Sequence, residues 1–239
     1  HGNKQAKDYI KYLLTEEEPV LNKPVFQTIF PWECSSLSFE DCKSNLLKED
    51  FVDSLSNDSV DGDYKFPLDR HPYKHQLDSW KAMIQDKKTI VVTTGTGSGK
   101  TECFMLPVLH DLYNERLNGN TEGVQAIFIY PLNALMNSQE KRIRAWCSSL
   151  PNQVTYSVYN GETPRKAAPG KSVESSYPKL ESREEIRATP PQILFTNPTM
   201  LNYMLVRDED QQILQKSKGK LRWILLDEAH TYTGSSAAE

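Results

Sequence analysis

Apolar runs rich in β-branched and aromatic residues recur along this chain, and stretches with apolar residues at helical spacing separate them. The run 124–130 is almost continuously apolar, which is typical of a strand buried on both faces of a parallel sheet. Similar runs predict strands at 89–93, 154–158, 192–196 and 221–226. This alternation predicts an α/β fold: a mostly parallel central sheet, flanked by helices and built from right-handed βαβ units.

The beginning of the chain has only helical patterns. Apolar residues spaced as on one helix face predict a first helix within 3–14. Ser38 is the predicted N-cap of a further helix that continues to about Leu55. We therefore expect this region to form a small helical appendage that contributes no strand to the sheet.

Polar segments indicate how the chain is organised. The stretch 54–63 is rich in Asp and poor in apolar residues, so we interpret it as a linker. The predicted domains are accordingly a helical N-terminal appendage with its linker, residues 1–63, and a main domain, residues 64–239. The long polar stretch 165–191 mixes basic residues with acids, which favours a surface insertion over a nucleic-acid-binding patch.

A glycine-rich loop follows the strand predicted at 89–93. It contains Gly95, Thr96, Gly97, Ser98, Gly99, Lys100 and Thr101. Glycines let backbone N–H groups turn inward around an anion, and the helix that opens at Gly99 adds the positive end of its dipole. We expect Lys100 to reach the β- and γ-phosphates of ATP and the Thr101 hydroxyl to ligate Mg²⁺. A strict P-loop has Gly at the position of Thr94.

Two adjacent acids follow the strand predicted at 221–226. The carboxyl ends of parallel strands are where open α/β sheets bind ligands. We expect Asp227 to bind Mg²⁺ through water and Glu228 to orient or deprotonate the attacking water. His230 is expected to carry a hydrogen bond from the γ-phosphate site to a neighbouring domain. Paired acids after a strand are often only loop polarity, but the Lys-Thr pair upstream favours nucleotide hydrolysis.

A glutamine opens the helix that precedes the glycine-rich loop. The amide of Gln76 has the donor and the acceptor that the N6/N7 edge of adenine requires, and Tyr73 is placed to stack on the ring. A single Gln at a helix start is usually a polar surface residue. The loop that follows it favours an adenine-binding role.

The helix predicted after the strand 124–130 has features of a phosphate-binding site. Its free N–H groups lie beside Asn133 and Ser138, and basic residues follow at Lys141, Arg142 and Arg144. An ordinary solvated helix shows the same charges, so composition leaves both interpretations open.

Bulk properties narrow the class of protein. The chain has 239 residues, of which 38% are hydrophobic, so a sizeable core is possible. Its net charge of −4 gives no global basic field, and any contact with nucleic acid must come from a local surface. The four cysteines lack paired short spacings, which argues against zinc and disulfides and for a reducing, cytoplasmic setting. No apolar run reaches transmembrane length, so no membrane association is expected.

The motifs follow the order found in superfamily 2 DEAD/DEAH-box helicases, which the chain resembles from about Phe66 onward. They look like the Q motif, motif I, motif Ia, the GG region, motif Ib and motif II, and they lie at Gln76, 94–101, 131–139, 160–161, 196–198 and 227–230. In finer detail the stretches 130–135, 159–164 and 227–232 resemble large bacterial DNA helicases of the Hrq/MrfA type. Similar helicases occur in phage-defence systems such as DISARM and Druantia.

The resemblance implies a RecA-like P-loop domain that binds ATP and Mg²⁺ and acts on nucleic acid, with DNA favoured over RNA. It implies that Asn133, Gly161, Thr196 and Pro198 contact the phosphate backbone of one strand. The GG region has Asn160 in place of its first glycine. Partner proteins of a defence system are a further implication.

The resemblance also implies a second RecA-like domain in the same full-length chain. In the family that domain supplies arginine fingers, which are worth roughly 10³–10⁵ in rate for NTPases. The sequence reaches Glu239 before a motif III is seen, so we expect this polypeptide to be the first motor domain of a longer ATP-hydrolysing helicase. By itself it is expected to bind ATP weakly, if at all, and to hydrolyse it negligibly. A duplex translocase that does not separate strands, and a nucleotide-binding scaffold without turnover, stay open as alternatives.

Overall fold

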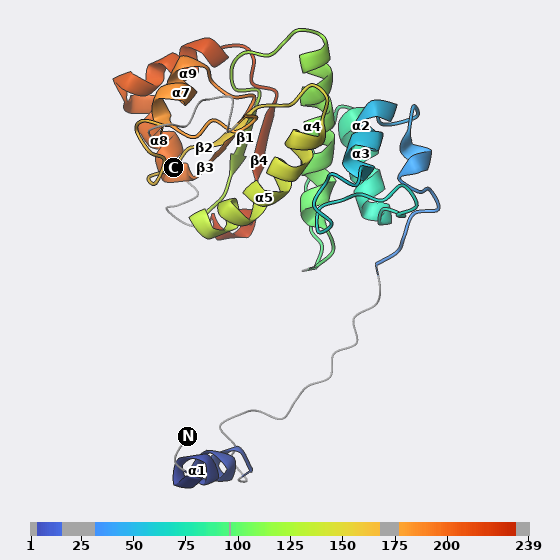
Figure 1. Ribbon diagram of the computed structural model, residues 1–239, viewed down its shortest axis with the longest axis vertical. Helices are drawn as coiled ribbons and strands as arrows, with labels where there is room; N and C mark the ends of the chain where they lie inside the picture. The colour runs from blue at the N-terminus through green and yellow to red at the C-terminus, as the bar shows by residue number, and fades with distance from the viewer. Residues whose placement is uncertain (1–3, 16–31, 96, 168–176, 233–239) are drawn as a thin grey trace. The chain divides into compact units, whose positions relative to one another are not determined.

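The computed structural model of the chain describes residues 4–15, 32–95, 97–167 and 177–232 (Figure 1). The chain divides into two compact units, His1–Trp32 and Glu33–Glu239. The described part of the first unit is helix α1 (Lys4–Thr15), which confirms the helix predicted from the apolar spacing. The second unit contains the sheet and the other helices.

A four-stranded, all-parallel sheet forms the centre of the second unit, with strand order β2-β3-β1-β4. Its strands are β1 (Ala126–Ile129), β2 (Tyr156–Val158), β3 (Ile193–Thr196) and β4 (Trp223–Leu226). Ile129 lies opposite Thr196 on one side and Leu226 on the other. The strand ends are thus in register, and the residues that follow them gather at one edge of the sheet. The predicted α/β fold is confirmed.

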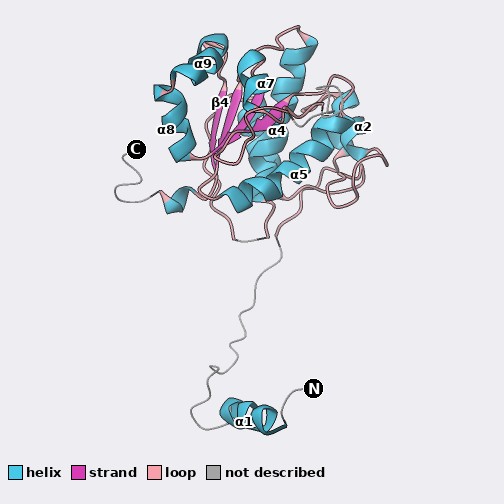
Figure 2. Ribbon diagram, turned by 60° about the vertical axis from the view of Figure 1, so that its left-hand side comes forward, coloured by secondary structure: helices cyan, strands magenta, loops and turns pink. Residues whose placement is uncertain are grey.

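Helices cover both faces of this sheet (Figure 2). The first face packs against α4 (Lys100–Leu117) and α5 (Asn133–Ser149). Outside these two helices, α3 (Lys74–Ile84) packs against α4 and α2 (Glu49–Ser56) packs against α5 (Figure 1). The second face packs against α7 (Arg183–Ala188), α8 (Pro198–Val206) and α9 (Gln211–Ser217). Short 3-10 turns lie at η1 (Glu40–Cys42), η2 (Asp208–Asp210) and η3 (Ala229–Thr231).

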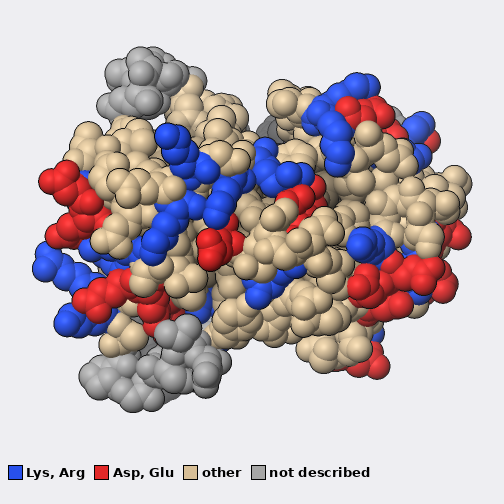
Figure 3. All heavy atoms as spheres, turned by 90° about the horizontal axis from the view of Figure 1, so that it is seen from above, with Lys and Arg blue, Asp and Glu red and all other residues tan. Residues whose placement is uncertain are grey.

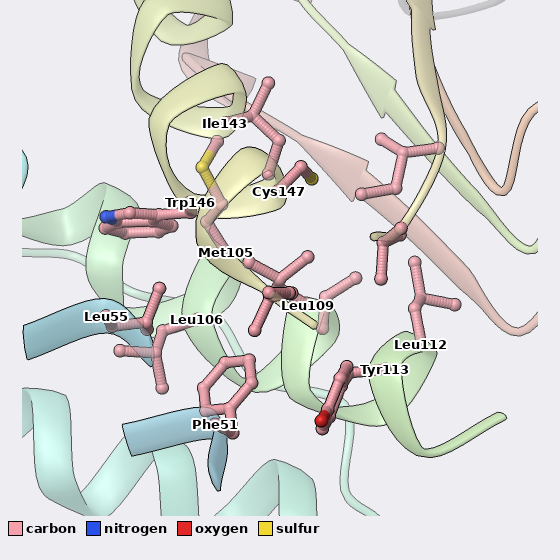
Figure 4. Close-up of a cluster of buried hydrophobic side chains, with 14 of the residues drawn as sticks. Phe51, Leu55, Met105, Leu106, Leu109, Leu112, Tyr113, Ile143, Trp146 and Cys147 are labelled. Atoms are coloured by element: carbon pink, nitrogen blue, oxygen red, sulfur yellow. The ribbon is translucent and has the colours of Figure 1, made fainter. Parts of the chain in front are cut away.

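The main core lies between α2, α4, α5 and the sheet (Figure 4). Phe51 and Leu55 of α2 point toward Leu106 of α4, and Trp146 of α5 lies beside the same cluster. All four side chains are at most 1% exposed, so their burial supplies much of the hydrophobic stabilisation of the unit. Helix α2 therefore belongs to the core that supports the sheet.

The N-terminal helices depart from the prediction in two ways. The helix expected from Ser38 to Leu55 is wrong as a single element: it is divided into η1 and α2, and Ser44 between them has a φ of 59°. A left-handed residue cannot continue a right-handed helix. The division into compact units also falls between Trp32 and Glu33 and not at residue 63. Residue 63 as a functional domain boundary stays a prediction.

The strand predicted at 89–93 is wrong for this structure, because these residues pair with no strand of the described sheet. The connection through α4 to β1 lies on the same face as α5, which leads from β1 to β2. Two right-handed crossovers over the same face must move the chain in the same direction across the sheet. The crossover from β1 to β2 leads away from β4, so a strand at 89–93 is expected on the other side of β1, beyond β4. Val91 is 88% exposed, and the outer edge of β4 has no partner among the described residues. The apolar run therefore lacks a neighbouring strand.

Candidate nucleotide-binding site and nucleic-acid interface

The glycine-rich loop turns into α4 through two left-handed residues. Gly97 has a φ of 77° and Gly99, the residue before α4, has a φ of 72°. The left-handed backbone favours glycine at this position, and a Cβ added at Gly99 would lie 2.3 Å from Nε2 of Gln76 and would have to displace the end of that side chain. The first turn of an 18-residue helix is thereby aimed at the loop that precedes it.

Side chains of the loop bind its own backbone. Nζ of Lys100 donates a hydrogen bond to the Thr94 carbonyl at 2.9 Å, and the hydroxyls of Thr94 and Ser98 share one at 2.6 Å. Thr94, which stands where a strict P-loop has Gly, thus helps to close the loop. Thr101 is half-buried in the first turn of α4, and Gly95 is exposed. Thr96 lies outside the described residues.

Helix α3 holds this loop from the other side. Gln76 is fully buried: its Oε1 accepts the Tyr73 N–H at 2.9 Å and its Nε2 donates to the Gly99 carbonyl at 3.0 Å. A ring nitrogen of His75 lies 2.9 Å from the Ser98 carbonyl, and Nε1 of Trp80 donates to a carbonyl of α4 at 2.9 Å. Both polar atoms of the Gln76 amide are therefore engaged within the protein. Its adenine-binding role stays a prediction.

Tyr73 stacks on the His75 ring, with centroids 5.6 Å apart and planes inclined by 12°. The ring that was expected to meet adenine thus lies against the residue that contacts the loop. The importance of His75 was missed from the sequence. The only signal was its position next to a glutamine that opens a helix.

The acids after β4 lie beside the loop. The Asp227 N–H continues the sheet by donating to the Ile129 carbonyl at 3.1 Å, and its Oδ1 accepts the Glu228 N–H at 2.9 Å. Burial raises the pKa of Asp227, the charge of Glu228 raises it further, and the charge of Lys100 opposes both. The two motifs, 127 positions apart in sequence, are thus within range of a charge–charge interaction.

Glu228 has an unusual backbone. Its φ of 50° is left-handed, a conformation that costs a non-Gly residue on the order of 1 kcal/mol. The N–H and hydroxyl of Thr231 both donate to the Glu228 carbonyl at 2.8 Å, which holds the turn. Oε2 of Glu228 lies 3.3 Å from Nδ1 of His230, whose side chain is 77% exposed. The turn therefore presents Glu228 and His230 together at the strand end.

The donor set fits a hydrated Mg²⁺ ion better than a fully protein-bound metal. Among residues 4–15, 32–95, 97–167 and 177–232 there is no group of three or more His, Cys, Asp or Glu that could hold a metal. Mg²⁺ is usually held by one or two carboxylates together with substrate phosphates and water. Asp227 and the Thr101 hydroxyl suit that role. The hydroxyls of Tyr130 and Tyr232, on which the charge of Asp227 acts, are buried and have no hydrogen-bond partner. Polar groups that could bind a further ligand are thus available around this carboxyl.

Three loops at the same edge of the sheet carry the residues predicted to contact nucleic acid. Nδ2 of Asn133 lies 3.5 Å from Oε1 of Glu162, and Nδ2 of Asn197 donates to Oδ1 of Asn133 at 3.3 Å. These contacts join the ends of β1, β2 and β3. Gly161 is exposed and Pro198, the first residue of α8, is half-buried.

Thr196 differs from the other residues of this group. It is fully buried, and its hydroxyl donates to the Tyr159 carbonyl at 2.9 Å, so the hydroxyl links β3 to the end of β2. The strand-binding roles of Asn133, Gly161, Thr196 and Pro198 stay predictions.

An arginine supports the loop that contains Gly161. Arg183 donates to the carbonyls of Thr163 and Asn160 at 3.0 and 2.9 Å, and its guanidinium lies 5.4 Å from the Tyr159 ring centroid. Asn160 is 3% exposed and accepts the Glu162 N–H at 2.9 Å, so it shapes the turn where the family has glycine. The sequence placed Arg183 in a polar surface insertion. Its buried contacts had no local signal, because they depend on where α7 packs.

A model of the DEAD/DEAH box helicase family matches residues 73–239, which is more than half of the chain. The chain belongs to the DEAD/DEAH box helicase family. The stretch matched by that model contains the loop, Gln76, the three strand-end loops and Asp227, so the family assignment and the geometry concern the same residues.

Several proteins resemble this helicase domain. It is 26% identical over 266 residues to Druantia protein DruE of Escherichia coli, covering 72% of this chain and 14% of that protein. An uncharacterized ATP-dependent helicase of Methanocaldococcus jannaschii is 31% identical over 162 residues, covering 68% of this chain and 21% of the relative. The ATP-dependent helicase hrq1 of Schizosaccharomyces pombe is 29% identical over 182 residues, covering 75% and 15%.

The helicase MrfA, in a crystal structure bound to DNA and AMPPNP, has a similar fold. Its TM-score is 0.58 at 24% identity, over 86% of this chain and 24% of that one. The structure bound to DNA alone gives a TM-score of 0.55 at 23% identity, over 80% and 22%. These likenesses confirm the fold. The chain spans only 14% to 24% of the length of these relatives.

The surface of the helicase domain has no single sign of charge on the face shown in Figure 3, where basic and acidic side chains are interspersed. Contact with nucleic acid therefore needs local donors such as those of the strand-end loops.

None of the helices within the described residues is long and apolar enough to cross a membrane. Cys34, Cys42, Cys103 and Cys147 are free thiols.

Proposed function

We propose that this chain is the ATP-binding first motor domain of an ATP-dependent helicase that acts on nucleic acid, with DNA favoured over RNA. The observation that carries the proposal is that the charge of Lys100, at the start of α4, acts on the carboxyl of Asp227, which directly follows β4. A lysine on a glycine-rich loop that interacts electrostatically with a half-buried carboxylate suits a nucleotide phosphate and its metal ion. The names of relatives such as hrq1 support ATP dependence.

In this proposal each residue has a defined role. Lys100 exchanges the Thr94 carbonyl for the β- and γ-phosphates, and backbone N–H groups of 97–101 bind the phosphate oxygens. Thr101 and Asp227 would hold Mg²⁺, which when bound would supply positive charge to the phosphates. Glu228 positions or deprotonates the attacking water, and His230 couples the γ-phosphate site to the second RecA-like domain.

Nucleic acid would lie across the loops after β1, β2 and β3. The amide of Asn133, the exposed backbone of Gly161 and the first turn of α8 at Pro198 offer donors to phosphates without reading bases. A MrfA structure contains DNA, which supports DNA as the substrate class. Likeness to DruE supports a place in an anti-phage defence system, where further proteins would be partners.

A non-unwinding duplex translocase is the second candidate, because backbone contacts of this kind serve both activities. A scaffold without turnover is less well supported, since the chain has Lys100, Asp227 and Glu228 and the charges of the first and last act on Asp227. Comparing ATPase stimulation by single-stranded and duplex DNA in a chain that includes the second RecA-like domain separates the two motor activities.

The first test is titration of a fluorescent ATP analogue with Mg²⁺ into this chain and into Lys100→Ala. We expect saturable binding that is lost in the variant, because the phosphates lose their main cation. Lys218→Ala is the matched control: it removes the same charge from an exposed position just after α9, and binding should be unchanged. Equal binding by Lys100→Ala and the unchanged chain would contradict the proposed site.

A further inference from the structure

Tyr130 and Asp227 are cross-strand neighbours at the carboxyl edge of the sheet. Tyr130 directly follows β1 and Asp227 directly follows β4, and the last paired residues of these strands are Ile129 and Leu226. The Asp227 N–H continues the ladder to the Ile129 carbonyl at 3.1 Å. Because side chains alternate along a strand, Tyr130 and Asp227 project from the face that packs against α4.

The Tyr130 ring is fixed but its hydroxyl has no partner. The side chain is 0% exposed, and its ring stacks on Phe195 at a centroid distance of 6.0 Å with planes inclined by 20°. The hydroxyl is buried and makes no hydrogen bond. A buried hydroxyl without a partner is unfavourable, so a native protein that keeps one gives reason to look for the group that completes it.

Asp227 has the matching acceptor. Its Oδ1 accepts the Glu228 N–H, and its second oxygen, Oδ2, accepts no hydrogen bond from the described residues. Burial, together with the charge of Asp227, raises the pKa of Tyr130, so the phenol keeps its proton and acts as a donor. A buried donor without an acceptor and a carboxylate oxygen without a donor among the described residues thus follow neighbouring strands on the same face of the sheet, where Mg²⁺ is expected.

We propose that Tyr130 is a positioning residue for this metal site: its hydroxyl donates a hydrogen bond to the second oxygen of Asp227 when nucleotide and Mg²⁺ bind. The carboxylate would then be held at both oxygens, by the Glu228 N–H and by Tyr130, in one orientation. Groups behind a ligand that fix its orientation strengthen metal binding. This inference rests on the proposed nucleotide-binding function.

Tyr232 also has a buried hydroxyl without a partner near Asp227. It lies just after the turn η3 and is only half-buried. Tyr130 is the stronger candidate because the sheet ladder and the stack on Phe195 hold its ring in place.

The test compares Tyr130→Phe with Tyr156→Phe. Tyr156 on β2 is a matched control, because it is also 0% exposed, also has a hydroxyl without a partner, and lies at the opposite edge of the sheet from β4. For each protein, binding of a fluorescent ATP analogue is titrated with Mg²⁺ and measured again in excess EDTA. We expect Tyr130→Phe to need about tenfold more Mg²⁺ for half-saturation, the value of one hydrogen bond to a charged group. In EDTA it should bind like the unchanged chain, and Tyr156→Phe should match the unchanged chain in both conditions.

Two results would overturn the inference alone. One is an unchanged Mg²⁺ requirement in Tyr130→Phe. The other is weakened binding without the expected specificity, either equal in both variants or equal for Tyr130→Phe with and without Mg²⁺, because both patterns point to packing and not to the metal site. If the unchanged chain and Lys100→Ala both bind the analogue and do so equally well, the proposed function itself fails, and this inference fails with it.

Discussion

At the scale of single residues, the glycine-rich loop depends on two glycines with a left-handed backbone, Gly97 and Gly99. Gly99 has a left-handed backbone, and the space beside it is occupied by the Gln76 amide, which donates a hydrogen bond to the Gly99 carbonyl. Gly97 is also left-handed, but a Cβ there would meet nothing within 4 Å. A side chain at Gly97 would therefore meet only the strain of the left-handed backbone, whereas a side chain at Gly99 would also meet the Gln76 amide.

We predict that Gly97→Ala costs about 1 kcal/mol of unfolding free energy, from the left-handed backbone alone. Gly99→Ala should cost roughly 2 kcal/mol or more beyond that, because its methyl group must displace a fully buried side chain. Urea unfolding monitored by tryptophan fluorescence gives both values. Equal costs would show that the contact between α3 and the loop does not stabilise the fold.

At the scale of elements, α2 is tied to α4 by buried polar contacts as well as by apolar packing. Nε2 of His110 on α4 accepts the N–H of Lys48, the residue before α2, at 3.1 Å. The Tyr113 hydroxyl, one turn further along α4, donates to Asp50 at 2.6 Å. Accepting the Lys48 N–H requires the neutral imidazole, and burial lowers the pKa of His110 to about 4.

This arrangement predicts a dependence of stability on pH. The unfolded chain takes up a proton on this histidine near pH 6.5 and the folded chain only near pH 4, so His110 makes unfolding easier as pH falls through that range. The loss approaches on the order of 3 kcal/mol at the lower end. Thermal unfolding between pH 7 and pH 4 tests it. His110→Gln should flatten the slope, whereas His71→Gln, at an exposed position, should leave it as it is.

At the scale of the whole molecule, the sheet has an unfinished edge. Ile224 and Leu226 of β4 are 63% and 56% exposed, and the apolar run 89–93 beyond them pairs with nothing among the described residues. Since the chain spans 14% to 24% of the length of its relatives, we propose that further parts of a longer protein cover this edge and complete the motor.

We predict that this chain by itself hydrolyses ATP negligibly, because arginine fingers from a second domain are worth roughly 10³–10⁵ in rate. A chain extended through that domain should hydrolyse ATP faster by a factor of that order when DNA is added. Hydrogen exchange follows the same change: amides in 89–93 should exchange fast in this chain and slowly in the longer one. Substantial turnover by the short chain would contradict the two-domain requirement.

The α/β class, the presence of strands within 124–130, 154–158, 192–196 and 221–226, and the positions of the glycine-rich loop and the paired acids all followed from the sequence. These features depend on local patterns: apolar runs define buried strands, and a glycine-rich loop before a helix defines an anion site. The family resemblance given by those motifs is confirmed. The roles of individual site residues stay predictions.

Only the tertiary structure decided what each pattern contacts. The run 89–93 has the composition of a strand, but a strand needs a partner, and pairing depends on parts of the fold far away in sequence. Gln76 has the chemistry for adenine, yet its amide holds Gly99; Arg183 lies in a polar stretch, yet it supports the loop of Gly161. Local sequence fixes the chemistry that a residue offers. The packing of distant elements decides where that chemistry is used.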